Sequence, residues 1–176
     1  MKNIITLGGS SSRNSINKQL AEYVGELVNN VTLIKIDLNK FEMPLFSVDI
    51  EAKQGFSEGT KKLNELFEKA DGFIISLAEH NGAYSAAFKN TFDWLSRVEA
   101  KVFRNKPLIL LSTSPGVRGG QSVLEIALNR FPYHNANIVG SLAFPSFNEN
   151  FNNGQVTNME LKQKLLSVVQ KFENTI

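Results

Sequence analysis

A run of glycine and hydroxyl residues near the start of the chain has the composition of an anion-binding loop. Residues 8–17 read Gly-Gly-Ser-Ser-Ser-Arg-Asn-Ser-Ile-Asn. The run follows a short apolar stretch typical of a strand, Ile4–Leu7, and precedes apolar residues at helical spacing. A loop in this position presents backbone N–H groups at the positive end of a helix dipole. We therefore expect it to bind an anion, most simply a phosphate group.

Two common nucleotide-binding motifs and a simple helix cap fit this run less well. A Walker-type loop would end in Gly-Lys-Ser/Thr, and a dinucleotide-binding loop would space its glycines as G-x-G-x-x-G; neither pattern occurs here. A helix cap and a turn would use one or two of the polar residues. Four serines, one arginine and two asparagines exceed that need, which favours phosphate binding.

Two further polar loops each lie between an apolar run and a helical pattern. Residues 78–84 read Ala-Glu-His-Asn-Gly-Ala-Tyr, and their backbone groups could contact the edge of a planar heterocycle. The chain has only two histidines, and His134 lies in a different segment from His80, so no metal site is expected.

Residues 112–120 read Ser-Thr-Ser-Pro-Gly-Val-Arg-Gly-Gly, where paired glycines permit close approach of a ligand. Arg118 could attract the phosphates of a nicotinamide dinucleotide or could simply be solvated.

Composition excludes several classes of function. The chain has 176 residues, of which 42% are hydrophobic and 20% charged, with a net charge of +2. This charge is weak and unclustered, so no nucleic-acid partner is expected. The absence of cysteine excludes disulfides, thiolate metal sites, Fe–S clusters and a cysteine nucleophile. No apolar run approaches membrane-spanning length and no signal peptide is recognised, so we expect a cytoplasmic protein without a membrane partner.

Strand and helix patterns alternate along residues 1–176, which we interpret as one domain. Helices are expected at Ser15–Val28, around Leu63–Ala70, at Tyr84–Val102, around Val123–Phe131 and around Leu161–Phe172, with residues 39–59 less regular. Strands are expected at Asn3–Leu7, Thr32–Leu38, Gly72–Leu77, Pro107–Ser112 and Asn137–Phe144.

This alternation predicts an α/β protein, and at this length a flavodoxin-like three-layer α/β/α sandwich with a five-stranded parallel sheet fits best. The strand order 2-1-3-4-5 is expected by analogy with flavodoxin-like proteins. The three polar loops then converge at the carboxyl ends of the strands. The helix at Tyr84–Val102 is apolar on more than one side, because Trp94 and Val98 lie beside the stripe of Phe88 and Phe92. Either deep burial in the monomer or a subunit interface would explain a helix that is apolar on more than one side.

Together the three loops resemble those of the NADPH-dependent FMN reductase family, which includes azoreductase-, quinone-reductase- and chromate-reductase-type enzymes. The family motif G-S-x-R-x-x-S-x-N is similar to residues 9–17, with Ser12 in the arginine position and Arg13 displaced by one. Hydroxyl contacts would then replace a charged phosphate contact. The motif S-x-S-P-G-x-x-G-G matches residues 112–120 well.

The second family motif is T-P-E-Y-N-G, followed later by L-K-N-A-I-D-W-x-S-R. It resembles residues 78–82 with the preceding leucine, and residues 88–97. Ala78 replaces the proline and His80 replaces the tyrosine. In the family this loop lines the isoalloxazine ring, so His80 could change stacking, redox tuning or acceptor preference.

The resemblance implies a site for flavin mononucleotide (FMN) made by the three loops, with no catalytic acid–base residue and no metal. The phosphate would be held by Ser10, Ser12, Ser15, Ile16 and Asn17. The ring would be flanked by Ala78, Glu79, His80, Asn81 and Gly82. Its other side would be closed by Ser112, Ser114, Gly116, Val117, Arg118 and Gly119.

The resemblance also implies an FMN-dependent oxidoreductase. NADPH or NADH would transfer hydride to flavin N5 and leave, and a small-molecule acceptor would then be reduced: a quinone, an azo compound, a metal oxyanion or a free flavin. The family implies a homodimer or homotetramer with the helix at Tyr84–Val102 in the interface. A flavodoxin-type electron carrier is the alternative, but such carriers are usually strongly acidic, and the +2 charge argues against one. A cofactor-free scaffold that serves as an interaction module is a third possibility.

Overall fold

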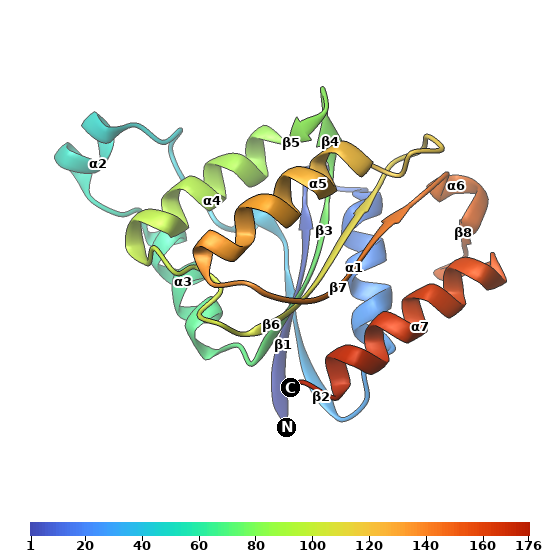
Figure 1. Ribbon diagram of the computed structural model, residues 1–176. Coiled ribbons are helices and arrows are strands. Elements are labelled where there is room, and N and C mark those ends of the chain that lie inside the picture. Colours follow the sequence, from blue (N-terminus) through green and yellow to red (C-terminus); the bar gives the residue numbers. More distant parts are fainter.

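Five parallel strands form the central sheet of the structure, a computed structural model that describes residues 1–176 (Figure 1). The strand order is β2-β1-β3-β6-β7, which confirms the predicted order 2-1-3-4-5. All six residues of β3 are buried, as expected of a central strand that reads as an unbroken apolar run. The strands are β1 (Lys2–Gly9), β2 (Val31–Ile36), β3 (Gly72–Leu77), β6 (Pro107–Thr113) and β7 (Asn137–Phe144).

Helices cover both faces of this sheet and enclose two separate cores (Figure 1). Successive residues of β1 point to opposite faces, so that Ile5 belongs to one core and Ile4 to the other. The Ile5 core lies under three helices, α3 (Glu58–Lys69), α4 (Ala86–Val98) and α5 (Gln121–Arg130). The Ile4 core lies under α1 (Ile16–Glu26) and α7 (Met159–Glu173). The predicted three-layer flavodoxin-like sandwich is confirmed.

Short elements occur where the sequence predicted irregular chain or longer helices. The predicted helix at Tyr84–Val102 begins only at Ala86, because the Ser85 side chain caps it, and ends at Val98. The short elements are η1 (Leu38–Lys40), α2 (Val48–Gln54), β4 (Glu79–His80), β5 (Ala83–Tyr84), η2 (Phe131–His134), α6 (Phe147–Asn150), β8 (Phe151–Asn152) and β9 (Gln155–Val156).

The helix α2 was not predicted because none of its residues is buried, so it shows no apolar stripe. It begins at a Ser47 cap and ends at Gly55, whose φ is +67°. The chain before α2 is held to α4 by the Phe46 N–H, which donates to Asn90 Oδ1 at 2.8 Å, and by the Pro44 carbonyl. The indole N–H of Trp94 donates to the Pro44 carbonyl at 2.7 Å, and the Asn90 amide donates to the same oxygen at 3.0 Å.

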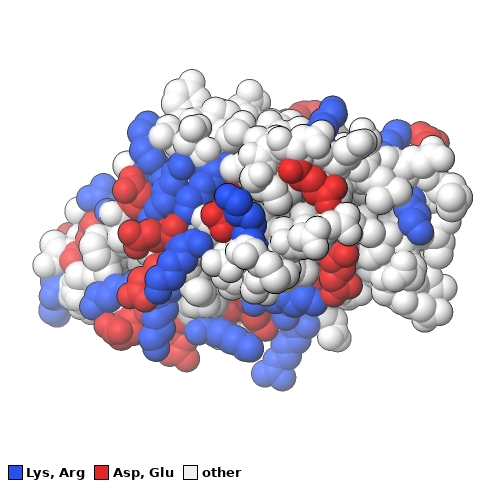
Figure 2. Space-filling view, turned by 90° about the horizontal axis from the view of Figure 1, so that it is seen from below, with Lys and Arg blue, Asp and Glu red and all other residues white.

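The end of the sheet where the strands begin carries charges of both signs. Figure 2 shows this end from below, with lysine and arginine side chains interleaved with aspartate and glutamate. None of the helices combines the length and the apolar character that crossing a bilayer requires. The carboxyl ends of the strands, at the top of Figure 1, form the opposite end.

Candidate functional site

A cavity of about 210 Å³ opens at the carboxyl ends of β1, β3 and β6. The loops after these three strands all contribute to its lining, as the strand order predicts for a topological switch point. The lining residues are Ser10, Ser12, Asn14, Ser15, Ile16 and Asn17 from the first loop, Ala78, Glu79 and His80 from the second, and Thr113, Ser114 and Pro115 from the third.

The predicted site residues divide into two groups by position. One group lines the cavity: Ser10, Ser12, Ser15, Ile16, Asn17, Ala78, Glu79, His80 and Ser114. The other group belongs to the same loops without lining it: Asn81, Gly82, Ser112, Gly116, Val117, Arg118 and Gly119. Three lining residues were not predicted, namely Asn14, Thr113 and Pro115, although each lies inside a motif read from the sequence. Their position between predicted residues was the signal that could have identified them.

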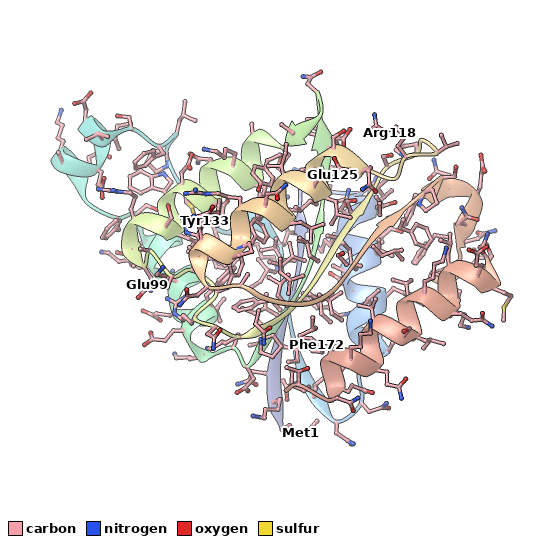
Figure 3. The ribbon with its side chains drawn as sticks, viewed as in Figure 1. Met1, Glu99, Arg118, Glu125, Tyr133 and Phe172 are labelled. Atoms are coloured by element: carbon pink, nitrogen blue, oxygen red, sulfur yellow. The ribbon has the colours of Figure 1, made fainter.

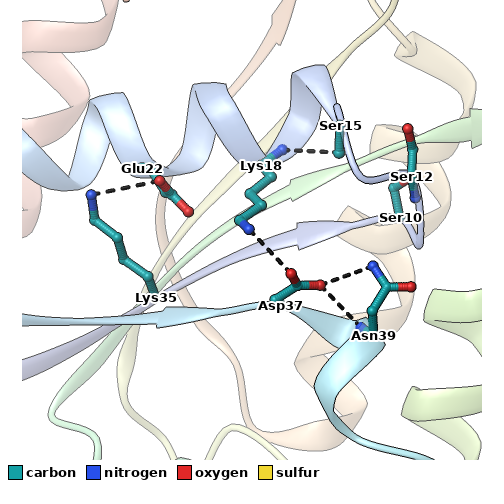
Figure 4. Close-up of polar contacts among 8 residues, drawn as sticks. All are labelled: Ser10, Ser12, Ser15, Lys18, Glu22, Lys35, Asp37 and Asn39. Atoms are coloured by element: carbon teal, nitrogen blue, oxygen red, sulfur yellow. Dashed lines mark hydrogen bonds and ion pairs between the residues drawn. The ribbon is translucent and has the colours of Figure 1, made fainter.

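The first loop presents unpaired donors at the start of α1. Figure 4 shows Ser10, Ser12 and Ser15 of this loop beside that end of the helix. Ser15 caps the helix, because its Oγ accepts the Lys18 N–H at 3.1 Å. The backbone N–H groups of Ile16 and Asn17 donate no hydrogen bond within the chain. Helix starts leave such groups free, and the helix dipole favours a negative charge in front of them. The geometry is therefore that of an anion site.

No lysine or arginine lines this cavity. Lys18 on the first turn of α1 points away to Asp37, with 3.3 Å between Nζ and Oδ2 (Figure 4). Burial alone would raise the pKa of Asp37, but hydrogen bonds from Asn39 and from Lys18 outweigh burial and lower it. An anion at this site would be held by neutral donors, which agrees with hydroxyl contacts in place of the family's arginine.

The second loop is a tight hairpin formed by β4 and β5. Asn81 and Gly82 make its turn with φ values of +51° and +76°, the two-residue geometry that an Asn-Gly pair favours. Beside the turn, Glu79 Oε2 accepts the Val123 N–H at 3.0 Å and so places a carboxylate at the start of α5. The Ser85 hydroxyl donates to the Gly9 carbonyl at 2.7 Å and joins this loop to the end of β1.

The third loop folds back onto the end of β7. The Ser112 hydroxyl donates to the Gly119 carbonyl at 2.8 Å. Gly119 has a φ of +59°, and a Cβ there would lie 2.6 Å from the Phe144 carbonyl carbon, so only glycine fits. Arg118 is exposed at the upper edge of the molecule, where its Nη2 donates to Ser122 Oγ at 3.2 Å (Figure 3). This places Arg118 outside the cavity lining.

Known proteins are similar in sequence to most of this chain. The profile of the family described as NADPH-dependent FMN reductase matches residues 2–149. A quinone reductase of Escherichia coli is 29% identical over 117 residues, which are 66% of this chain and 62% of that protein. An NADPH azoreductase of a Bacillus species is 31% identical over 122 residues, 69% of this chain and 64% of that protein. The chain thus spans less than two thirds of the length of these relatives.

Solved structures share the fold over almost the whole chain. FerB, described as a flavoenzyme NAD(P)H:(acceptor) oxidoreductase from Paracoccus denitrificans, superposes with a TM-score of 0.81. The match has 22% sequence identity and covers 99% of this chain and 97% of that one. At this identity the likeness establishes the architecture.

Proposed function

Because the chain belongs to the NADPH-dependent FMN reductase family, we propose that it binds FMN in this cavity and transfers electrons from NADPH or NADH to a small-molecule acceptor. The observation that carries the proposal is the pair of unpaired N–H groups at the start of α1, inside a cavity that three loops complete. Quinones, azo compounds and flavin are named for relatives, and they are the acceptor classes we propose first, ahead of metal oxyanions.

The residues of the cavity suit the two ends of FMN. The Ile16 and Asn17 N–H groups and the hydroxyls of Ser10 and Ser12 would hold the phosphate, since none of these N–H groups has a partner in the chain. The loop that begins at Ala78 would lie along the isoalloxazine ring. When bound, FMN supplies the hydride chemistry, so the protein needs to position the ring and control access to it. We assign no residue as an acid–base catalyst.

A titration of the purified protein with FMN tests the proposal directly. We expect quenching of flavin fluorescence at micromolar concentration and bleaching of the bound flavin by NADPH or NADH without a partner reductase. A protein that binds FMN but is not bleached by either nucleotide would instead be an electron carrier. Absence of quenching would refute FMN binding and favour a cofactor-free scaffold. A screen of NAD(P)H oxidation with quinone, azo, metal-oxyanion and flavin acceptors then identifies the substrate class.

We also propose that the protein is a homodimer or homotetramer whose interface includes α4. A groove of about 370 Å³ lies between α4 and α5, and it is lined by Phe92 and by Ile126, which is 38% exposed. The Tyr84 hydroxyl borders the same groove and is buried without a hydrogen-bond partner. A second subunit would cover the apolar atoms. Light scattering should give at least twice the monomer mass, and Ile126→Glu should shift it toward the monomer. The cytoplasmic location stays a prediction.

A further inference from the structure

The side chain of Asn17 lies where the three loops meet and makes three hydrogen bonds inside the protein. Its Oδ1 accepts the Ser76 hydroxyl at 2.7 Å and the Thr113 N–H at 3.0 Å. Its Nδ2 donates to the Thr113 carbonyl at 3.1 Å. The two bonds to Thr113 determine the orientation of the amide, because a backbone N–H needs an oxygen opposite it and a carbonyl needs an N–H.

These contacts join segments that are distant in the sequence. Asn17 is on the first turn of α1, Ser76 is near the end of β3, and Thr113 ends β6. The chain of hydrogen bonds continues to the edge strand, because the Thr113 hydroxyl donates to the Phe144 carbonyl on β7 at 2.7 Å. One side chain on α1 therefore links the ends of β3 and β6, where the second and third loops of the cavity begin.

The network is shielded from water. Asn17 is 3% exposed, Thr113 is 1% exposed and Ser76 is fully buried. Removing the amide would take these bonds from the Ser76 hydroxyl and from the N–H and carbonyl of Thr113, residues with almost no exposed surface, and buried polar groups without partners are destabilising. The loops would have to move to solvate these groups.

We propose that Asn17 is a positioning residue, whose side chain holds the three flavin-binding loops relative to one another and does not serve as a phosphate ligand. The inference rests on the proposed function. It assigns the anion contact to the Asn17 backbone N–H and the loop geometry to its amide. Loss of the side chain should consequently weaken contacts to the whole flavin, at the ring as well as at the phosphate.

A comparison of FMN with riboflavin, which lacks the phosphate, separates the two roles. A phosphate ligand affects only FMN, whereas a positioning residue affects both flavins. We expect Asn17→Ala to weaken the binding of FMN and of riboflavin by the same factor, about tenfold or more. Loss of FMN affinity with unchanged riboflavin affinity overturns the inference, and so does unchanged affinity for both. If the wild-type protein binds neither flavin, it is the proposed function that fails.

Two more variants keep the test informative if Asn17→Ala folds poorly. Ser76→Ala removes one of the three bonds at a residue outside the cavity lining. It should weaken the binding of FMN and of riboflavin by the same factor, and by a smaller factor than Asn17→Ala does. Circular dichroism at the titration temperature establishes that each variant is folded, because a change of stability alone leaves the affinity of a folded protein unchanged. A loss confined to FMN in Ser76→Ala would contradict the inference.

The substitution Asn17→Asp adds a pH-dependent test. An ionised aspartate places an oxygen against the Thr113 carbonyl, whereas a protonated one can donate to that carbonyl as the amide does. Riboflavin affinity of Asn17→Asp should therefore recover as pH falls from about 8 to about 5, since burial raises the pKa of a carboxyl. The titratable groups of the cavity, Glu79 and His80, are common to both proteins, so the wild-type profile is the control. A riboflavin affinity equal to wild type at pH 8 overturns the inference.

Discussion

Replacing Gly8 by alanine should weaken FMN binding about 100-fold, because this glycine sets the position of the anion site. Gly8 is in β1 directly beneath the first turn of α1. A Cβ at Gly8 would lie 2.5 Å from the Lys18 backbone nitrogen and 2.6 Å from its Cα. Ordinary contacts begin at 3.4 Å, so the turn must move by about 0.9 Å, the difference between 3.4 and 2.5 Å. Backbone cannot yield as a flexible side chain would.

The magnitude follows from the two N–H groups carried on that turn. A hydrogen bond of about 2.9 Å that lengthens by most of an ångström is lost. Bonds to a charged group contribute about 1.5–3 kcal/mol each. Allowing for partial adjustment of the ligand, loss of the Ile16 and Asn17 contacts should cost about 3 kcal/mol, or about 100-fold in affinity. Riboflavin should also lose affinity, because the same turn carries the Asn17 amide that bonds Ser76 and Thr113, but it should lose less than FMN since it makes no phosphate contact. The forced contact should also lower the free energy of unfolding by about 1–3 kcal/mol.

The assay is a fluorescence titration with FMN and riboflavin at a temperature where the variant is folded. Gly140→Ala is a matched control, because its Cβ would lie 2.6 Å from Val168 Cγ1 on α7, away from the cavity. This control should lose stability and keep flavin affinity. Folded Gly8→Ala that binds FMN as tightly as the wild-type protein would refute the placement of the phosphate at α1.

Three other expectations concern the loops and the groove around the cavity. Glu79→Ala should lower the free energy of unfolding by about 1–3 kcal/mol, because the Val123 N–H loses its acceptor. Glu79→Gln keeps an acceptor oxygen and should recover most of this loss. Urea unfolding measures both variants. Burial raises the pKa of Tyr84 from 10.0 to about 12, so the folded state holds the phenol proton more tightly than the unfolded state does. The free energy of unfolding should therefore fall as the pH rises from 10 to about 12, and it should fall less in Tyr84→Phe. Trp94→Phe removes the bond to the Pro44 carbonyl and should speed limited proteolysis of residues 41–57; an unchanged rate would show that this bond does not restrain the segment.

Local patterns in the sequence were sufficient to predict the five strands of the sheet. The buried strand β3 was recognisable because a strand covered on both faces must be apolar at every residue. Helix α2 could not be recognised, because it buries nothing and so carries no periodic signal. The β4–β5 hairpin did leave a signal, the Asn-Gly pair at residues 81 and 82, which is favoured where both turn residues have positive φ.

The sequence by itself determined the succession along the chain of the five sheet strands and the five long helices, and the composition of the three loops, because hydrophobic period and turn chemistry are local properties. It could not decide which polar atoms of those loops face a ligand. Asn17 was predicted as a phosphate contact from its place in a motif, yet its amide bonds Thr113, 96 residues away. The Glu79 carboxylate likewise meets Val123, 44 residues away. Such partners come together only when the strand order brings loop ends to one edge of the sheet, so tertiary structure decided which side chains hold the site together and which backbone groups remain free for an anion.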